Sequence, residues 1–382
     1  MNKVNLPENV RQWLFMGLQV MIVLLAMAIG YFGHRYILQA QEDLGILKQA
    51  RSIVEENAIF ELPSDEKLQH GMVRGMLESL NDPYTFFVEP AVHEIQTDEL
   101  AGSFGGIGVR LERDTELNWR LYPFSGSPAL QAGVQDGDIL IEVDDLTITT
   151  STDDINLLAA LRGPIGEQVQ ISVRRGSQTL NFSIDRQDFP LPTVSWNLLP
   201  EAADIGLIKV NRIAETTADE MRDAIKDLQD RGAEYLVLDL RDNGGGLVEA
   251  GVEIVKLFLM DGEVLYQQFN DQKVEIFKVS NEGEFSKLPM VLLVNGNTAS
   301  SAEIVAGALK KHERALIIGT STYGKTSIQY IFDLQDGASI HVTSGRWWIP
   351  GVSFPLAPDY PVTEDPSGIA AMQKAVEILR DE

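Results

Sequence analysis

The sequence of 382 residues contains no cysteine, which excludes disulfide bonds, thiolate metal ligands and a cysteine nucleophile. Basic residues are also scarce: 31 Lys and Arg stand against 56 Asp and Glu, and the formal net charge is -25. Because so acidic a chain repels polyanions, we expect no nucleic acid partner. The histidines are too dispersed along the chain to suggest a metal site, and we expect no metal and no cofactor. They are His34, His70, His93, His312 and His341.

Long hydrophobic stretches are also rare, and the longest lies near the start. Gln12 to Gly33 contains no charged residue over about the 20 positions that a helix needs to cross a bilayer. Trp13 and Tyr31 stand near its ends, where interfacial aromatic residues belong. A cleaved signal peptide is the alternative, but Leu38 occupies a cleavage position that needs a small residue. We therefore predict an uncleaved transmembrane signal-anchor at residues 12–34, after an N-terminal tail of residues 1–11, with the remainder extracytoplasmic, in the periplasm or at the cell exterior.

Three regions follow the predicted anchor, and together they indicate a multidomain α+β and α/β protein. Residues 35–100 predict a helical arm with helices at 42–60 and 64–80. Residues 101–188 change to short strands separated by glycine turns, typical of a small β-rich domain. Residues 189–382 alternate strands and helices, which favours a mostly parallel sheet covered by helices.

The segment GTSTYGKT, residues 319–326, fits the phosphate-binding pattern G-x-x-x-x-G-K-[ST]. That loop needs a helix directly after it, because the first amides of the helix hold the phosphates. Here residues 327–342 instead alternate apolar and polar side chains around an Asp-Gly turn, which predicts a β-hairpin. The sequence thus disfavours nucleotide hydrolysis.

A hydrolytic serine remains possible, although neither H-E-x-x-H nor G-x-S-x-G occurs. Ser300 and Ser301 lie between an apolar strand and a helix, whose first amides could stabilise an oxyanion. A simpler interpretation stays open, because Ser300 and Glu303 also fit a helix capping box. Lys325 could likewise be an ordinary solvated lysine, and the glycines at 244–246 an ordinary turn.

Several motifs, in this order, resemble those of the carboxyl-terminal processing proteases, also called tail-specific proteases. The motifs are NDPYTFFVEP, SFGGIGV, GSPALQAGVQDGDILIEVD, DLRDNGGG, NTASSAEIVAGAL and YGKTSIQ. The resemblance covers nearly the whole chain beyond the anchor. It implies a membrane-anchored serine endopeptidase that acts on protein or peptide substrates, with a PDZ-like domain at 101–188 and a protease core at 189–382.

The resemblance also assigns roles to individual residues. Ser300 matches the family nucleophile, Lys325 the general base and Gln329 a residue that orients the lysine. Burial must make the lysine neutral enough to accept a proton, and in an extended strand Lys325 and Gln329 would point the same way. The implied oxyanion donors are the amides of Ser301 and of Gly244 or Gly245.

The PDZ-like domain implies substrate selection. Such domains bind a C-terminal segment as an added strand and hold its carboxylate on backbone amides. Gly106, Ile107 and Gly108 occupy the matching loop, and an apolar pocket would favour apolar tails. The main alternative is an inert scaffold that binds tails through this domain without cleaving them.

The sequence departs from the family in two places. Some members have an aspartate eleven residues after the nucleophile, where this chain has Lys311, so no role for that carboxylate carries over. The ending is compact, with Pro350, Gly351 and Pro358-Asp359 as the recognisable remnant. A homo-oligomer formed through the C-terminus is therefore left open.

Overall fold

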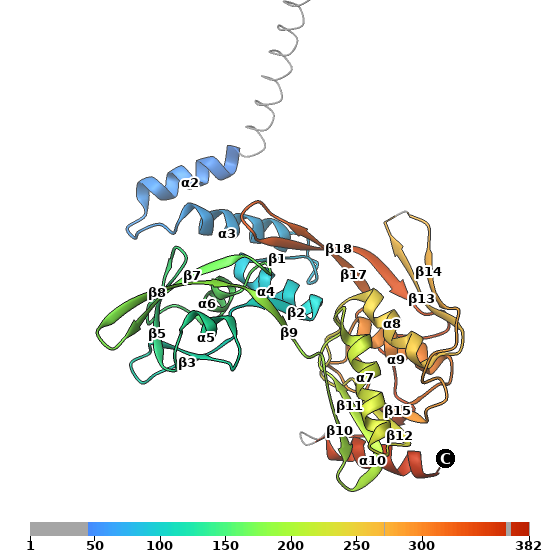
Figure 1. Cartoon of the computed structure of the whole chain (residues 1–382). Helices are drawn as coiled ribbons and strands as arrows, with labels where there is room; N and C mark the ends of the chain where they lie inside the picture. Colours follow the sequence, from blue (N-terminus) through green and yellow to red (C-terminus); the bar gives the residue numbers. More distant parts are fainter. Residues whose placement is uncertain (1–44, 271, 364–367, 382) are drawn as a thin grey trace, which may run out of the picture. The chain divides into compact units, whose positions relative to one another are not determined.

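A computed structural model describes residues 45–270, 272–363 and 368–381 (Figure 1). The predicted membrane span lies outside these residues. Within the described part, no helix is long and apolar enough to cross a membrane. The chain divides into two compact units, Met1–Gly71 and Met72–Glu382.

In the first unit, α2 (Gly45–Asn57) buries none of its side chains. Its Arg51 bonds the carboxylates of Glu55 at 2.6 Å and of Asp65 at 2.7 Å. Asp65 begins α3 (Asp65–Glu78), whose acidic first turn complements the positive end of the helix dipole. Both predicted helices of the arm are confirmed, and α3 extends past Gly71 into the second unit.

In the second unit, the region at 101–188 is a small antiparallel domain. Its main sheet has the order β3-β4-β5-β7-β8, with β6 beside β5, and β2 pairs with β9. Along β7, buried Val169, Ile171 and Val173 alternate with more exposed neighbours, so one face of the sheet packs on the core. The elements are β2 (Ser103–Gly106), β3 (Val109–Arg113), β4 (Trp119–Pro123), α5 (Pro128–Ala132), β5 (Asp138–Val143), β6 (Leu146–Thr147), α6 (Asp154–Leu161), β7 (Gln168–Arg175), β8 (Gln178–Asp185) and β9 (Gln187–Pro190).

The region after 189 is built on a six-stranded sheet in the order β10-β11-β12-β15-β16-β19. All neighbours in it run parallel except β10 and β11, which confirms the predicted mostly parallel sheet. The strands are β10 (Val194–Leu199), β11 (Ala202–Val210), β12 (Tyr235–Asp239), β15 (Met290–Val294), β16 (Leu316–Gly319) and β19 (Tyr360–Pro361).

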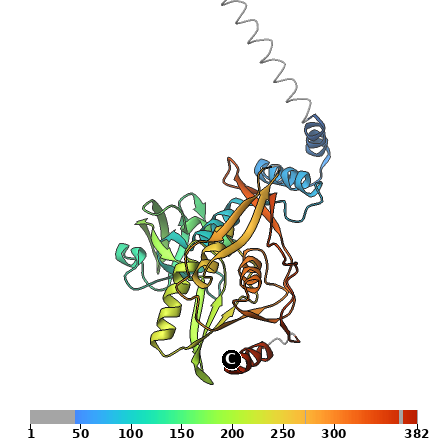
Figure 2. The ribbon, with the colours of Figure 1, turned by 90° about the vertical axis from the view of Figure 1, so that its right-hand side faces the viewer.

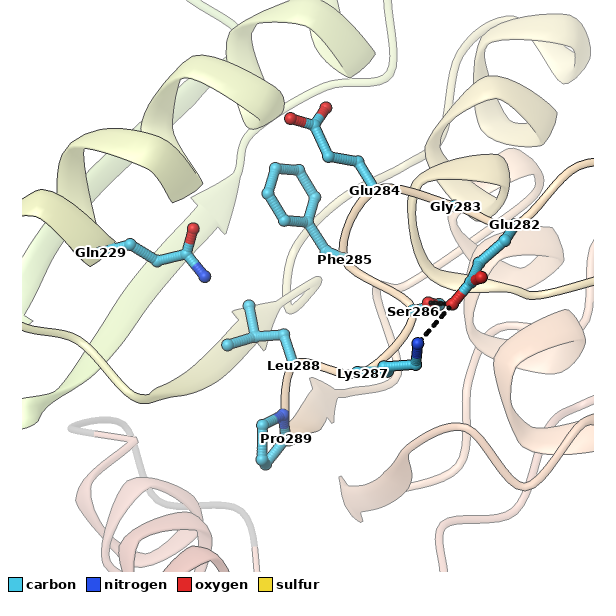
Figure 3. Close-up of a pocket in the computed structure, with 9 residues that line it drawn as sticks. All are labelled: Gln229, Glu282, Gly283, Glu284, Phe285, Ser286, Lys287, Leu288 and Pro289. Atoms are coloured by element: carbon cyan, nitrogen blue, oxygen red, sulfur yellow. Dashed lines mark hydrogen bonds and ion pairs between the residues drawn. The ribbon is translucent and has the colours of Figure 1, made fainter.

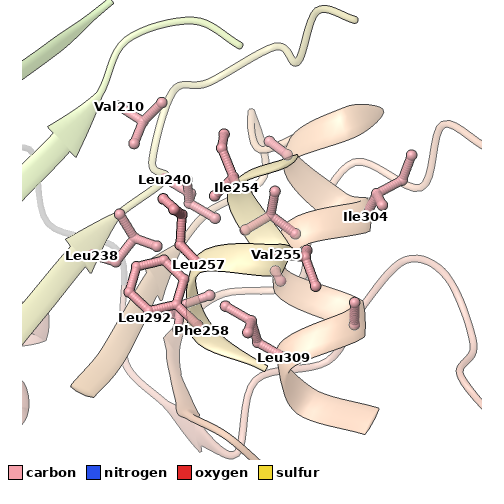
Figure 4. Close-up of a cluster of buried hydrophobic side chains, with 14 of the residues drawn as sticks. Val210, Leu238, Leu240, Ile254, Val255, Leu257, Phe258, Leu292, Ile304 and Leu309 are labelled. Atoms are coloured by element: carbon pink, nitrogen blue, oxygen red, sulfur yellow. The ribbon is translucent and has the colours of Figure 1, made fainter. Parts of the chain in front are cut away.

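Helices cover both faces of this sheet. Leu238 and Leu292 pack on one face with α7 (Thr217–Asp230), α8 (Val248–Phe258) and α9 (Ser301–Lys311), as Figure 4 shows for part of the cluster. The intervening Val237 and Leu293 pack on the other face with α10 (Ile369–Asp381). Figure 2 shows α10 in red at the carboxyl end of the chain. Successive residues of a strand point to opposite faces of the sheet. Buried apolar runs such as MVLLV therefore contribute side chains to the helix layers on both faces.

A second sheet has the order β1-β18-β13-β14, and β17 also pairs with β18. The antiparallel pair of β17 (Ser327–Asp333) and β18 (Ser339–Trp348) confirms the predicted hairpin. Two strands of this sheet, β13 (Gly262–Phe269) and β14 (Glu275–Val279), were not predicted from the sequence. A third, β1 (Phe86–Val88), falls within the predicted helical arm but pairs with β18, and α4 (Pro90–Ala101) follows it.

Candidate active site

Three loops leave the carboxyl ends of neighbouring parallel strands and carry the predicted site residues. The loop after β12 holds Gly244–Gly246, the loop after β15 ends at Ser300, and the loop after β16 contains Lys325. Such ends meet at one edge of a sheet, where α/β proteins commonly bind ligands. The last of these loops leads into β17 and not into a helix, so Lys325 is not in a phosphate-binding loop.

Ser300 has an unusual backbone conformation, with φ 55° and ψ -123°. A residue other than glycine at such angles costs about 1–3 kcal/mol, and strain of this kind concentrates at functional sites. Ser300 immediately precedes α9, so the free first-turn amides of this helix start beside it. The nucleophile of α/β-hydrolases sits on a similarly strained turn between a strand and a helix.

A capping box is present at Ser300. The Ser300 amide donates to Glu303 Oε2 at 3.0 Å, and the Ser300 side chain faces the Glu303 amide. The Glu303 amide also donates to the Ser300 carbonyl at 2.8 Å. Capping accounts for the position of Glu303 but not for the positive φ of Ser300, so the geometry fits both a helix cap and a nucleophile.

Glu303 joins two of the loops, a role that was not predicted from the sequence. Its fully buried carboxylate accepts the Ser300 amide, the Thr322 hydroxyl, the Gly324 amide at 2.8 Å and the Lys325 amide at 2.9 Å. Hydrogen bonds to a buried carboxylate are stronger than neutral ones. One side chain thus fixes the backbone of both Ser300 and Lys325. The S-x-x-E pattern marked this glutamate, but its partners 19 to 22 residues away carry no local signal.

Lys325 is half-buried, and burial lowers the pKa of its amine. Its Nζ lies 5.0 Å from the centroid of the Tyr84 ring. Among the described residues no charged group contributes to this shift, so desolvation acts alone. A lysine with a lowered pKa and no carboxylate partner has the properties of a general base, and the interpretation of Lys325 as a solvated lysine does not fit this environment.

Gln329 is less simply placed. Its side-chain amide donates to Ser327 Oγ at 2.9 Å. The pairing of β17 with β18 shifts register between Ile328 and Gln329, and Lys325 precedes the strand. Because a register shift breaks the regular alternation of side chains, strand alternation does not put Lys325 and Gln329 on one face here. The role of Gln329 in orienting the lysine stays a prediction.

Gly245 packs directly against the serine loop. A Cβ added to it would lie 2.8 Å from Ala299 O, 2.9 Å from Ser300 Cβ and 3.0 Å from Ser301 N, and its φ is 97°. Only glycine fits so close an approach. Buried Asn243 joins the glycine loop to the serine loop, since its backbone carbonyl accepts the Ala299 amide at 3.0 Å.

The oxyanion prediction needs one adjustment. The Gly245 amide donates to Asn243 Oδ1 at 2.8 Å, so in this conformation it is already engaged. Of the two predicted glycines, Gly244 is the remaining candidate, alongside the Ser301 amide. A Cβ added to Gly244 would meet nothing within 4 Å, which indicates that this glycine faces open space.

Of the predicted tail-binding residues, Gly106 ends β2 and pairs with Gln187 of β9, and Ile107 and Gly108 connect it to β3, an edge strand of its sheet. Gly108 has φ 72°, and its carbonyl accepts the Phe124 amide at 3.0 Å. Ile107 is buried in the domain core, so its side chain packs and only its backbone could meet a ligand. An open strand edge after a glycine loop is the arrangement that adding a peptide strand requires.

One pocket lies away from these residues. A pocket of 530 Å³ is lined by Gln229 near the end of α7 and by residues 282–289 (Figure 3). Pro289 precedes β15, so this pocket is at the amino end of that strand, opposite to Ser300. Within the described residues there is no group of His, Asp and Glu able to hold a metal ion.

Comparisons with known proteins identify the two domains. The model of peptidase family S41 matches residues 204–362, and that of the PDZ domain matches residues 105–185. A carboxy-terminal processing protease, CtpA, of Bacillus subtilis is 33% identical over 291 residues, covering 75% of this chain and 61% of the relative. A probable CtpA-like serine protease of Staphylococcus aureus is 26% identical over 351 residues, covering 90% of this chain and 70% of the relative.

Among solved structures, the photosystem II D1 C-terminal processing protease is similar, with 28% identity and a TM-score of 0.47. The match covers 86% of this chain and 89% of that chain. The chain spans less than two thirds of the Bacillus relative, but both family models lie within it in the order that the motifs predicted. The chain therefore contains a PDZ domain followed by a peptidase family S41 domain, and it is similar to carboxyl-terminal processing proteases.

Proposed function

We propose that this chain is a serine endopeptidase in which Ser300 is the nucleophile and Lys325 the general base. One observation carries the proposal. Ser300 is held in a strained conformation at the start of α9, and the buried Glu303 carboxylate bonds both its amide and the amide of Lys325. A helix cap alone needs neither a strained backbone nor a buried carboxylate that joins two loops, and both cost free energy. A catalytic pair does need its two residues in fixed positions.

The proposed reaction follows from the lowered pKa of Lys325. The neutral amine takes the proton of the Ser300 hydroxyl, whose oxygen attacks the peptide carbonyl. The ammonium then returns this proton to the leaving amine, which leaves an acyl-enzyme that water hydrolyses. The Ser301 and Gly244 amides stabilise the developing oxyanion, a contribution of about 3 kcal/mol for each donor in comparable sites. Gln329 is proposed to orient the lysine.

Substrate choice is assigned to the PDZ domain. A protein tail binds along the open edge of β3, and the backbone of Gly106–Gly108 holds its terminal carboxylate. Apolar side chains of the tail pack against the domain, which selects apolar C-termini. The N-terminal segment, with its charge-free Gln12 to Gly33, anchors the enzyme to a membrane with the catalytic part on the extracytoplasmic side.

The test is cleavage of an unstructured protein with an apolar C-terminus by the full chain, purified in detergent. Native protein should cleave it, and Ser300→Ala and Lys325→Ala should each lose at least about a thousandfold in kcat/KM, because members of a catalytic unit fail together. A substrate with an acidic C-terminus serves as the specificity control. Tail binding without cleavage by the native chain would identify an inert scaffold and refute the proposal.

Membrane attachment is tested separately. Removal of residues 1–34 should move the protein from the membrane fraction to the soluble fraction. Protease added to intact spheroplasts should digest the catalytic part, and resistance until lysis would contradict an extracytoplasmic position.

A further inference from the structure

Tyr84 lies over the amine of Lys325, and nothing in the proposed reaction uses it. Its ring centroid is 5.0 Å from Nζ, within the range at which an aromatic face attracts a cation. Tyr84 comes from the segment between α3 and β1, far before the lysine in sequence. A contact across so long a stretch of chain depends on how the segment is held.

The segment is fixed by its own polar residues. Asp82 accepts the Tyr84 amide at 3.0 Å and the Thr85 hydroxyl at 2.7 Å. Thr85, which is buried, accepts the Thr343 amide of β18 at 3.0 Å. Contacts with the side chains of Thr343 and Thr85 lower the pKa of Asp82, so this carboxylate stays charged at neutral pH. These part-buried bonds hold the segment that carries the ring over the lysine.

Among the described residues, the groups around Lys325 do not give its amine a negatively charged partner. Burial, followed by the charges of His93 and Lys325, lowers the pKa of His341 on β18. The Tyr323 hydroxyl, in the loop before Lys325, raises the pKa of Tyr84, so the Tyr84 phenol is neutral. The Glu303 carboxylate binds the Lys325 backbone amide instead. Further out, His93 of α4 is bonded to Asp333 at 3.0 Å.

The tyrosine ring exerts two opposite effects on the lysine. Its face attracts the ammonium form, which favours protonation. Its bulk excludes water, which favours the neutral amine. Burial lowers the pKa of Lys325, and the Tyr84 ring, 5.0 Å from Nζ, is part of what surrounds the amine. We expect exclusion of water to be the stronger of the two effects of the ring.

We propose that Tyr84 is a positioning residue for Lys325, whose ring keeps water from the amine and holds Nζ in place over its face. The inference rests on the proposed Ser300–Lys325 reaction. It gives the motif NDPYTFFVEP a physical role in this chain, because Asp82 and Thr85 hold the tyrosine and the tyrosine covers the base.

The first experiment measures the acidic limb of kcat/KM against pH, because activity appears only as Lys325 loses its proton. Tyr84→Ala admits water and should move this limb to higher pH by about one unit, with about a tenfold loss at pH values below the limb. Tyr84→Leu keeps an apolar cover without the aromatic face and should move it to lower pH by about half a unit. Tyr84→Phe should leave the limb where it is.

A matched control is available at Tyr360, whose ring lies 5.3 Å from Lys374 Nζ. Tyr360→Ala removes an equivalent pair and should not move the limb. If Tyr84→Ala lowers activity without moving the limb, the ring has only a structural role and the proposal fails. If Tyr84→Ala does not fold, as judged by thermal melting, the comparison of Tyr84→Leu with Tyr84→Phe decides, and identical limbs overturn the proposal.

A second experiment separates this inference from the reaction itself. In the Ser300→Ala chain, the rate at which an acylating reagent labels Lys325 is measured against pH, with no turnover needed. Adding Tyr84→Ala should shift the labelling profile to higher pH by about one unit. An unchanged profile overturns the role of Tyr84 even if the protease is active. A shifted profile, combined with no cleavage by the native chain, supports the role of Tyr84 and refutes the proposed function.

Discussion

Two lysines of this protein lie over tyrosine rings at nearly the same distance, and their pKa values move in opposite directions. Lys325 Nζ is 5.0 Å from the Tyr84 ring, and Lys374 Nζ is 5.3 Å from the Tyr360 ring. Burial lowers the pKa of Lys325, whereas a hydrogen bond to Glu377 at 2.6 Å is the main cause that raises the pKa of Lys374. The aromatic contact therefore does not decide the charge of a lysine. The degree of burial and the presence of a nearby carboxylate decide this charge.

Replacing each lysine by arginine should give the largest difference in kcat/KM between the two positions. Arginine keeps the positive charge and the aromatic contact, but it does not lose its proton in proteins. Lys325→Arg should therefore lower kcat/KM at least about a thousandfold, and Lys374→Arg should have no effect on it. Kinetic measurements on both variants test this. Substantial activity in Lys325→Arg would show that the lysine acts by charge and not as a base.

Replacing the glutamate near each lysine, Glu303 or Glu377, should give a smaller difference in activity and stability. Glu303→Gln replaces one carboxylate oxygen, which accepts hydrogen bonds, by an NH2 group, which can only donate them. Two buried hydrogen bonds to the loops are therefore lost. We expect a loss of about 2–4 kcal/mol in the free energy of unfolding, with kcat/KM reduced about 10-fold to 100-fold.

Glu377→Gln is the matched variant at the surface, where an ion pair contributes little. It should lower the pKa of Lys374 towards its usual range and leave activity and unfolding by urea unchanged. If Glu303→Gln were equally mild, the carboxylate would not be what holds the two loops.

The smallest expected difference concerns stability and pH. Because the pKa of Lys325 is lowered on folding, the folded chain binds this proton less tightly than the unfolded chain. The free energy of unfolding then falls as pH drops from the ordinary lysine range through the lowered pKa. Lys325→Met removes this penalty and should raise the melting temperature at pH 7 by about 2–4 °C while abolishing activity.

For Lys374→Met, the expected effect of the lost charge on the free energy of unfolding has the opposite sign. The pKa of Lys374 is raised, so its protonated form favours the folded state, and the substitution should not stabilise. Thermal melts at about pH 7 and pH 10 separate the cases, because the gain from Lys325→Met should shrink at the higher pH. Equal gains at both pH values would mean that improved packing and not charge is responsible.

The parts of the fold that could be predicted well from sequence are those with local patterns. The alternation of Ile328, Tyr330 and Phe332 after Lys325 excluded a helix and indicated the β17–β18 hairpin. The apolar run Met290–Val294 indicated a buried parallel strand. The strands β13 and β14 were missed, although their pairing follows the same rules, because no turn signal was recognised between them.

The site was predicted less completely, because its contacts join distant segments. Ser300 and Lys325 followed from motifs, but the bonds from Glu303 to Thr322 and Gly324 depend on how two loops meet at the sheet edge. The register shift before Gln329 has no sequence signal that alternation could reveal. Likewise, three successive glycines did not indicate that the Gly245 amide would bind Asn243.

The Glu303 carboxylate has a consequence for how the site comes into being. It is the common partner of two loops that follow different strands, and each loop alone would leave part of its buried charge without a donor. The backbones of Ser300 and Lys325 therefore depend on the same carboxylate. We expect the two proposed catalytic residues to take up their positions together, as one cooperative event and not one after the other.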